Sequence, residues 1–367
     1  LETSQQNLAC ALPIIGMASI SEKGERTKKA RAFCFQARTG ASYEFAWARR
    51  CPDPQGKGAT VKEDGMNDFD VTAAKKATDY PRKVLDLFDA YVHGALDRRG
   101  FLNQCAAHVG GMISATAVLA ALSPDFARAQ VIAADDARIA TRWIEVPSPQ
   151  GYGMIRAYVA RPADMGSAAL PVVIVAHENR GLNPHIKDIA RRLALEGFMA
   201  IAPDALTTLG GYPGDEDKAR EMFATLDREK IGEDFVAAAN YARTMSGGNG
   251  QLATIGFCFG GGIANLLATR LPDLKAAIPF YGSPPPLANV PNIKAELLIH
   301  YAGNDARINA TWPDYKAALD KAGVRYQAFV YDGVEHGFNN DTTPRFDKAA
   351  ADLAWARSLT LLRQSTR

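Results

Sequence analysis

The chain has 367 residues, of which 42 are Lys or Arg and 40 are Asp or Glu, so its formal net charge is +2. Apolar residues make up 47% and charged residues 22%, which is ordinary for a globular protein. This balance, without a basic stripe, argues against a nucleic-acid partner, and no clean apolar run is long enough to predict a membrane span. The five cysteines contain no C-x-x-C pair, so they predict neither a metal site nor a disulfide framework, and we expect no cofactor.

The N-terminal part has two different textures. Residues 1–65 mix Arg, Lys, Cys and Gly with little sustained periodicity. From Met66 the pattern changes and leads into an amphipathic stretch from Tyr80 to Leu96, which predicts a helix. One interpretation is that Met66 is the natural start and that residues 1–65 are a non-native leader. The alternative is a disordered tail.

Residues 66–129 also contain the layout of a twin-arginine export signal. Paired arginines and a Phe-Leu lie within Arg98–Leu102, a weakly apolar segment follows at 105–122, and an Ala-x-Ala site ends at Ala129. This layout predicts cleavage near Gln130, export to the periplasm, and no stable membrane span after processing. The competing interpretation is an amphipathic structural helix in a cytoplasmic protein.

The remaining residues, 130–367, alternate between strand and helix signals. Turn residues between 141–146 and 153–160 predict a hairpin. Further strands are expected at 171–176, 198–202, 251–255, 276–280, 296–301 and 326–331, and helices at 186–196, 215–226, 232–244, 263–269 and 346–362. The alternation predicts an α/β domain with a mostly parallel central sheet, helices on both faces, and a site at the C-terminal ends of the strands.

Cys258 lies in a Gly-rich turn between a predicted strand and a predicted helix, in the sequence Gly256-Phe257-Cys258-Phe259-Gly260. This is the pattern of a nucleophile elbow, with Cys in the position usually held by Ser. Glycines are needed there because side chains at the flanking positions would collide with the neighbouring strand and helix. The helix N-terminus favours a thiolate. The alternative is a small buried cysteine in a tight turn.

Two more residues follow Cys258 in the chain order of a catalytic triad. Asp305 and His336 each follow a predicted strand, and the order nucleophile, acid, histidine is that of α/β-hydrolases. In this hypothesis Cys258 attacks an ester or lactone carbonyl and forms a thioester, His336 moves the proton, and Asp305 orients the imidazole. The alternatives are a thiol redox protein that uses a reactive Cys258, or a non-catalytic binding protein on the same fold.

From about residue 140 to its end, the chain resembles the dienelactone hydrolase family, in its exported-type branch. The motifs are GFCFGGG around Cys258, AGNDARI around Asp305, DGVEHGFNN around His336 and AHENRGL around Glu178. The resemblance implies the α/β-hydrolase fold and a small-molecule ester or lactone substrate. It also implies that Glu178 contacts the resting cysteine and helps to generate the thiolate.

The oxyanion hole and the substrate arginines are inferred from the same motifs. The backbone N–H groups of Phe259 and Asn179 are expected to form the hole, because these positions follow the nucleophile and the first parallel strand. In the family, an arginine four residues after the catalytic histidine grips a substrate carboxylate, but this chain has Asn340 there. The candidates that remain are three arginines, Arg345, Arg180 and Arg307. The sequence does not predict an oligomeric state.

Overall fold

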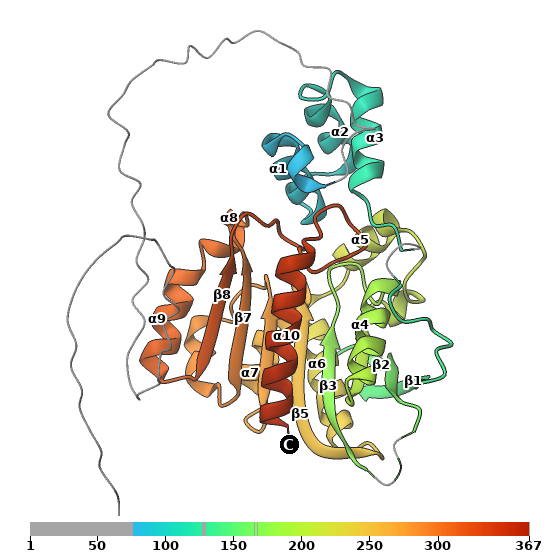
Figure 1. Cartoon of the computed structure of the whole chain (residues 1–367), viewed down its shortest axis with the longest axis vertical. Coiled ribbons are helices and arrows are strands. Elements are labelled where there is room, and N and C mark those ends of the chain that lie inside the picture. Colours follow the sequence, from blue (N-terminus) through green and yellow to red (C-terminus); the bar gives the residue numbers. More distant parts are fainter. Residues whose placement is uncertain (1–75, 127–129, 165, 167, 367) are drawn as a thin grey trace, which may run out of the picture. The chain divides into compact units, whose positions relative to one another are not determined.

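The computed structural model describes residues 76–126, 130–164, 166 and 168–366 (Figure 1). The predicted leader at 1–65 and the change of texture at Met66 lie outside the described residues. Within the described ranges, no helix has both the length and the apolar character needed to cross a bilayer.

A single eight-stranded sheet forms the centre of the hydrolase part, in the order β1-β2-β4-β3-β5-β6-β7-β8 (Figure 1). Its strands are β1 (Ile139–Ser148), β2 (Gly153–Pro162), β3 (Leu170–Ala176), β4 (Met199–Asp204), β5 (Gly248–Phe257), β6 (Ala276–Phe280), β7 (Glu296–Ala302) and β8 (Tyr326–Tyr331). The β1–β2 and β2–β4 pairs are antiparallel, and the pairs from β4 through β8 are parallel. The predicted hairpin and the mostly parallel sheet are confirmed.

Helices cover both faces of this sheet, as predicted. The helices of the hydrolase part are α4 (Pro184–Leu195), α5 (Glu216–Ala224), α6 (Arg228–Arg243), α7 (Phe259–Arg270), α8 (Ala306–Asn309), α9 (Trp312–Ala322) and α10 (Lys348–Ser365), with short turns η2 (Thr207–Leu209) and η3 (Leu287–Asn292). Strand β3 divides its side chains between two cores. Val172 and Ile174 belong to the core that also contains residues of α5, α6, α7 and α9, whereas Val173 and Val175 belong to the core that contains residues of α4 and α10.

Three further helices precede the sheet and share a core of their own. They are α1 (Arg82–Val92), α2 (Arg98–Ala106) and α3 (Met112–Leu122), preceded by the turn η1 (Ala77–Asp79). The rings of Phe88 and Phe101 pack edge to face with centroids 6.0 Å apart, and Cys105 is fully buried beside them. The predicted helix at 80–96 therefore corresponds to α1 with shorter bounds. The expected export segment forms α2 and α3, and its cleavage stays a prediction.

Helix α7 begins at Phe259, four residues earlier than the sequence predicted. The prediction started after the glycines because glycine weakens a helix. Their role is close packing: a Cβ on Gly260 would lie 2.1 Å from the carbonyl oxygen of Ala176, and one on Gly261 would lie 2.6 Å from that of Phe280. The first turn of α7 can therefore lie directly against β3 and β6, which sets the position of the residue before it.

We predict that Gly260→Ala destabilises the protein by about 3 kcal/mol, because its Cβ would overlap a backbone oxygen that cannot move away. The matched control is Gly262→Ala in the same turn, where the nearest atom to the new Cβ is 3.8 Å away. This control should leave stability unchanged or slightly higher. Thermal unfolding of both variants measures the difference, and equal unfolding midpoints would contradict the packing argument.

Candidate active site

Cys258 occupies a strained turn between β5 and α7. Its backbone has φ 56° and ψ −113°, a region that residues other than glycine seldom adopt. The Cys258 N–H donates to the carbonyl of Phe280 at 3.0 Å, and the Gly261 N–H donates back to the Cys258 carbonyl at 3.0 Å. The thiol side chain is thereby fixed at the start of a helix, where backbone N–H groups favour a negative charge.

His336 and Asp305 come together from the loops after β8 and β7. His336 Nδ1 lies 2.5 Å from Asp305 Oδ2, and the other carboxylate oxygen of Asp305 accepts from the Ile308 N–H at 3.1 Å. The His336 Nε2 atom is buried and has no hydrogen-bond partner in the described part of the chain. A ring nitrogen of His336 lies within 4.8 Å of the Cys258 sulfur. The structure thus brings together the three residues predicted to form a triad.

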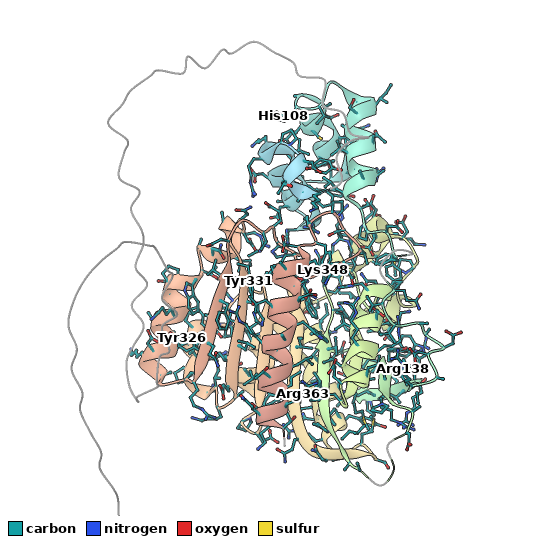
Figure 2. The ribbon with its side chains drawn as sticks, in the orientation of Figure 1. His108, Arg138, Tyr326, Tyr331, Lys348 and Arg363 are labelled. Atoms are coloured by element: carbon teal, nitrogen blue, oxygen red, sulfur yellow. The ribbon has the colours of Figure 1, made fainter. Side chains whose placement is uncertain are left out.

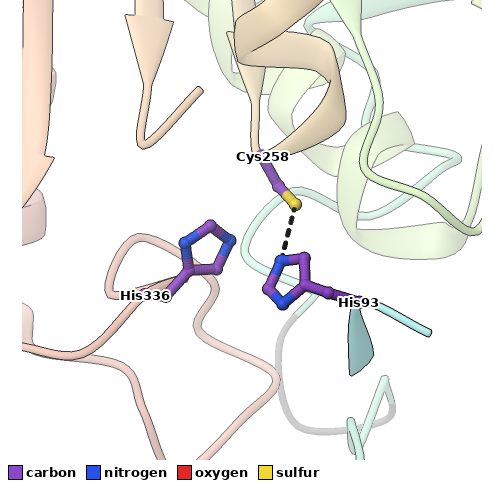
Figure 3. Close-up of side chains that lie close together, drawn as sticks. All are labelled: His93, Cys258 and His336. Atoms are coloured by element: carbon purple, nitrogen blue, oxygen red, sulfur yellow. Dashed lines mark hydrogen bonds between the residues drawn. The ribbon is translucent and has the colours of Figure 1, made fainter. Parts of the chain in front are cut away.

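A second histidine, His93, reaches the same sulfur from the N-terminal helices (Figure 3). It directly follows α1, and its Nε2 lies 3.5 Å from Cys258 Sγ. Its ring packs edge to face on that of His336, with centroids 4.6 Å apart. His93 was not predicted as a site residue, because it lies in no catalytic motif. The one available signal was Asp89, four residues earlier on the predicted helix, which lies 3.2 Å from His93 Nδ1.

Electrostatic coupling favours an ionised thiol. Burial favours the neutral thiol, but the imidazoles of His336 and His93 outweigh it and lower the pKa of Cys258 well below its ordinary value. Burial likewise disfavours the imidazolium of His336, but the thiolate and Asp305 outweigh it and raise the pKa of His336. Neutral pH lies between the pKa of Cys258 and the pKa of His336, so at neutral pH the pair is a thiolate beside an imidazolium.

The loop after β3 carries Glu178 and Asn179. Asn179 lines the pocket at the sulfur together with Phe259, which places both predicted oxyanion-hole residues at Cys258. The Glu178 carboxylate accepts from Asn340 Nδ2 at 3.1 Å. Asn340 is the position at which the sequence analysis noted a missing arginine. His177 bonds locally, with its Nδ1 2.6 Å from the Glu178 carbonyl.

The pocket beside the sulfur has a volume of about 360 Å³. Its lining includes His93, Arg228, Arg307, Tyr281 and Ser283. Ser283 follows β6 and lies beside the pocket. The pocket is large enough for a small organic substrate and offers two guanidinium groups.

The sequence profile of the dienelactone hydrolase family matches residues 155–366. The chain belongs to the dienelactone hydrolase family. A Saccharolobus solfataricus protein named "Putative carboxymethylenebutenolidase" is 35% identical over 246 residues, which cover 57% of this chain and 94% of that protein. A crystal structure named "Crystal Structure of Putative Dienelactone Hydrolase from Klebsiella pneumoniae subsp. pneumoniae MGH 78578" is 31% identical to this chain, with a TM-score of 0.55. The match covers 61% of this chain and 99% of that one.

Two further matches concern shorter stretches. An Escherichia coli K12 protein named "Putative hydrolase fragment YghX" is 46% identical over 115 residues, which are 31% of this chain and 97% of the fragment. A separate profile, described as YqhI-like, matches residues 72–109. As a member of the dienelactone hydrolase family, the protein is a hydrolase of carboxylic esters or lactones.

In this member of the dienelactone hydrolase family, the three arginines expected to bind substrate have different surroundings. Arg307 lines the pocket at the sulfur. Arg345 lines a separate pocket of about 180 Å³ that includes Asp305 and His336, and its guanidinium lies 5.2 Å from the Phe88 ring. Arg180 is buried and paired with Glu216 at 2.8 Å.

Arg228, which the sequence analysis did not consider, also lines the sulfur pocket. It opens α6, and its guanidinium stacks over the rings of Phe223 at 4.5 Å and Phe259 at 5.0 Å. Its position could not be recognised from the sequence because α6 is remote from the catalytic motifs and carries no motif of its own.

A metal ion is the other ligand that a cysteine and two histidines can hold. The ligand atoms of His93, Cys258 and His336 lie within 4.8 Å of one another. Against this, Arg307 Nη2 lies 2.9 Å from His93 Nε2, and Arg228 faces the same pocket. Two guanidinium groups repel a dication, so we assign no metal to these residues.

The electrostatics predict selective alkylation of Cys258 at neutral pH. Its rate with iodoacetamide should already be near its plateau at pH 7, because the thiol titrates below the ordinary value of about 8.5. Cys105 is the internal control, since burial raises its pKa to about 11 and it is fully buried. Mass spectrometry of the labelled peptides distinguishes the two sites. A Cys258 rate that rises with a midpoint near 8.5 would contradict the thiolate assignment.

Proposed function

We propose that the protein hydrolyses a small ester or lactone through a Cys258–His336–Asp305 triad and a thioester acyl-enzyme. The observation that carries this proposal is the convergence of the three side chains: His336 Nδ1 lies 2.5 Å from Asp305 Oδ2, and a ring nitrogen of His336 lies within 4.8 Å of the sulfur. A redox role has less support. The other described cysteine, Cys105, is buried in the separate core of the N-terminal helices and is not placed to resolve an oxidised Cys258.

The reaction follows from the thiolate–imidazolium pair. The Cys258 thiolate adds to the substrate carbonyl carbon, and the tetrahedral intermediate collapses when the alkoxide leaves and takes the proton from His336. For a lactone, the leaving alkoxide stays attached to the acyl group. The neutral imidazole then removes a proton from water, the hydroxide attacks the thioester, and the thiolate is restored as the carboxylic acid product leaves and gives its proton to the solvent. Asp305 holds the ring and stabilises its charged form throughout.

The oxyanion of each tetrahedral intermediate would be bound by the backbone N–H groups of Phe259 and Asn179. Phe259 is the first residue of α7, so its N–H has no partner within the helix. Removing one such donor typically costs about 3 kcal/mol in the transition state. Glu178 adjoins this loop and accepts from Asn340. In our proposal it turns toward the resting cysteine and favours loss of the thiol proton when substrate enters.

The substrate class that fits the pocket is an ester or lactone with a carboxylate near the scissile bond. Arg228 and Arg307 both line the pocket of the sulfur. The described contacts of Arg228 are the two aromatic rings beneath it, which leave its N–H edge available to an anion. In this proposal Arg228 and Arg307 bind the substrate carboxylate, which in the family is bound by an arginine at the position of Asn340.

Replacement of the nucleophile tests the triad. Cys258→Ala should lose hydrolysis of p-nitrophenyl acetate by at least about 1,000-fold while keeping its circular dichroism spectrum, because the attacking sulfur is gone. Cys258→Ser should also fall well below wild type, because His336 and Glu178 are matched to a thiol. Equal turnover by the alanine variant and wild type would sink the proposal.

The pocket arginines test the substrate class. Arg228→Gln should raise KM about ten-fold for an ester that carries a free carboxylate, such as a hemisuccinate, because a charged hydrogen bond is lost. For p-nitrophenyl acetate, which has no carboxylate, the variant should keep its KM. A matched control is Arg270→Gln at the far end of α7, where the arginine pairs with Glu233 at 2.7 Å. Equal changes for both substrates would reject the carboxylate assignment.

For residues 66–129 we propose two mutually exclusive hypotheses, and the first is export with cleavage by the twin-arginine pathway, which rests on the pattern around Arg98–Leu102 and the Ala-x-Ala site at Ala129. The intact mass of protein from its own host tests it. A chain that begins near Gln130 would support export with cleavage. A chain that retains residues 76–126 would support the competing interpretation, a structural helical segment in a cytoplasmic enzyme.

A further inference from the structure

Helix α1 contacts the loops that carry the proposed acid and base. Arg82 donates to both carboxylate oxygens of Glu335 at 2.8 Å and to the carbonyl of Asn304 at 3.1 Å. Glu335 precedes His336 in the sequence, and Asn304 precedes Asp305. The Asn304 side chain also donates to Glu335 at 2.7 Å, so one arginine of α1 joins the two loops.

The C-terminal end of α1 contacts the loop of the oxyanion hole. Asn179 Nδ2 donates to the carbonyl of Val92 at 2.8 Å, and Arg180 donates to Asn179 Oδ1 at 2.6 Å. The residue whose N–H would bind the oxyanion is therefore held by its side chain to the last residue of α1. His93, which follows Val92, contacts the sulfur itself.

His93 has the surroundings of a catalytic imidazole. Its Nδ1 is 2.8 Å from the Asp89 carbonyl and 3.2 Å from an Asp89 carboxylate oxygen, so this edge of the ring is fixed and Nε2 is directed at the sulfur. His336 is held by a direct side-chain contact, since its Nδ1 lies 2.5 Å from Asp305 Oδ2, whereas the hydrogen-bond partner of His93 Nδ1 is the Asp89 backbone carbonyl. The sulfur thus faces two imidazoles (Figure 3). The carboxylate of Asp89 lies beside the Nδ1 atom of His93, and that of Asp305 lies beside the Nδ1 atom of His336.

We propose that His93 is a second catalytic imidazole, which shares with His336 the stabilisation of the Cys258 thiolate. The helical segment from Ala77 to Leu122 is then part of the active site. This inference rests on the proposed function, because it assigns His93 to the nucleophile of that reaction. His93 lies outside the match to the dienelactone hydrolase family, which begins at residue 155, and inside the YqhI-like match to residues 72–109.

Other charged or titratable groups face the sulfur or act on it, and the test must separate His93 from them. They are His336 after β8, Arg228 at the start of α6, Arg307 in α8 and Tyr281 after β6. Glu178 after β3 acts on Tyr281. Arg307 competes directly, since it donates to His93 Nε2 at 2.9 Å when that nitrogen is unprotonated. Arg307 is 44% exposed in its side chain and can turn away when His93 takes a proton.

Coulombic coupling is consistent with this assignment. Burial opposes protonation of His93, but the Cys258 thiolate and the Asp89 carboxylate outweigh it and raise the pKa of His93. A proton on Nε2 would place a positive charge 3.5 Å from the sulfur. An opposite charge at such a distance typically shifts a pKa by about 1–3 units.

The test is the pH dependence of Cys258 alkylation by iodoacetamide in the full chain, for wild type, His93→Gln, His336→Gln and the double variant. Glutamine keeps a polar group near the position of Nε2 but cannot carry the charge. Each single variant should raise the apparent thiol pKa by about 1 unit or more, which lowers the rate about ten-fold at pH values below both pKa values. The double variant should lie closest to the ordinary value of about 8.5.

The matched control is His108→Gln, an exposed histidine on the same helical segment (Figure 2), which should keep the wild-type profile. Asp89→Asn removes the carboxylate that stabilises the charged form of His93, and it replaces His93→Gln in the test if that variant folds poorly. It should shift the profile in the same direction as His93→Gln. A wild-type profile in both His93→Gln and Asp89→Asn would overturn the inference. Alkylation requires no turnover, so this outcome is distinct from a failure of Cys258→Ala to abolish hydrolysis.

Discussion

The active site depends on one electrostatic constraint, a buried sulfur that is more stable as an anion than as a thiol. Burial alone would raise the pKa of Cys258, and the imidazoles reverse that effect. The reversal requires the sulfur to be held at a fixed place, which the strained backbone of Cys258 and the close packing of Gly260 provide. The glycines, the sheet order and the loop ends all contribute to this one placement.

The sequence predicted what is local or ordered along the chain. The elbow at Cys258 has a short motif, and Asp305 and His336 follow strands whose C-terminal ends meet at one edge of a parallel sheet. His93 and Arg228 could not be predicted in this way. Both lie at helix ends, His93 directly after α1 and Arg228 at the start of α6. An amphipathic pattern indicates the buried face of a helix but not which distant loop its end will contact.

The N-terminal helices link the question of export to the chemistry. A chain cut near Gln130 would keep Cys258, Asp305 and His336 but would lose His93 and the contact of Arg82 with two catalytic loops. The helices bury Phe101 and Cys105 in a core that a signal peptide does not require. In our account they are a retained part of the hydrolase, and the paired arginines at Arg98 and Arg99 begin α2.

The central claim is that Cys258 carries the acyl group as a thioester. The most direct measurement is peptide mass spectrometry of the protein after a short reaction with a p-nitrophenyl ester and an acid quench. The account predicts one added acyl group, located on the peptide that contains Cys258 and removed by hydroxylamine. A protein that turns over the ester while its Cys258 peptide stays unmodified, with the acyl group on another residue, would contradict the account.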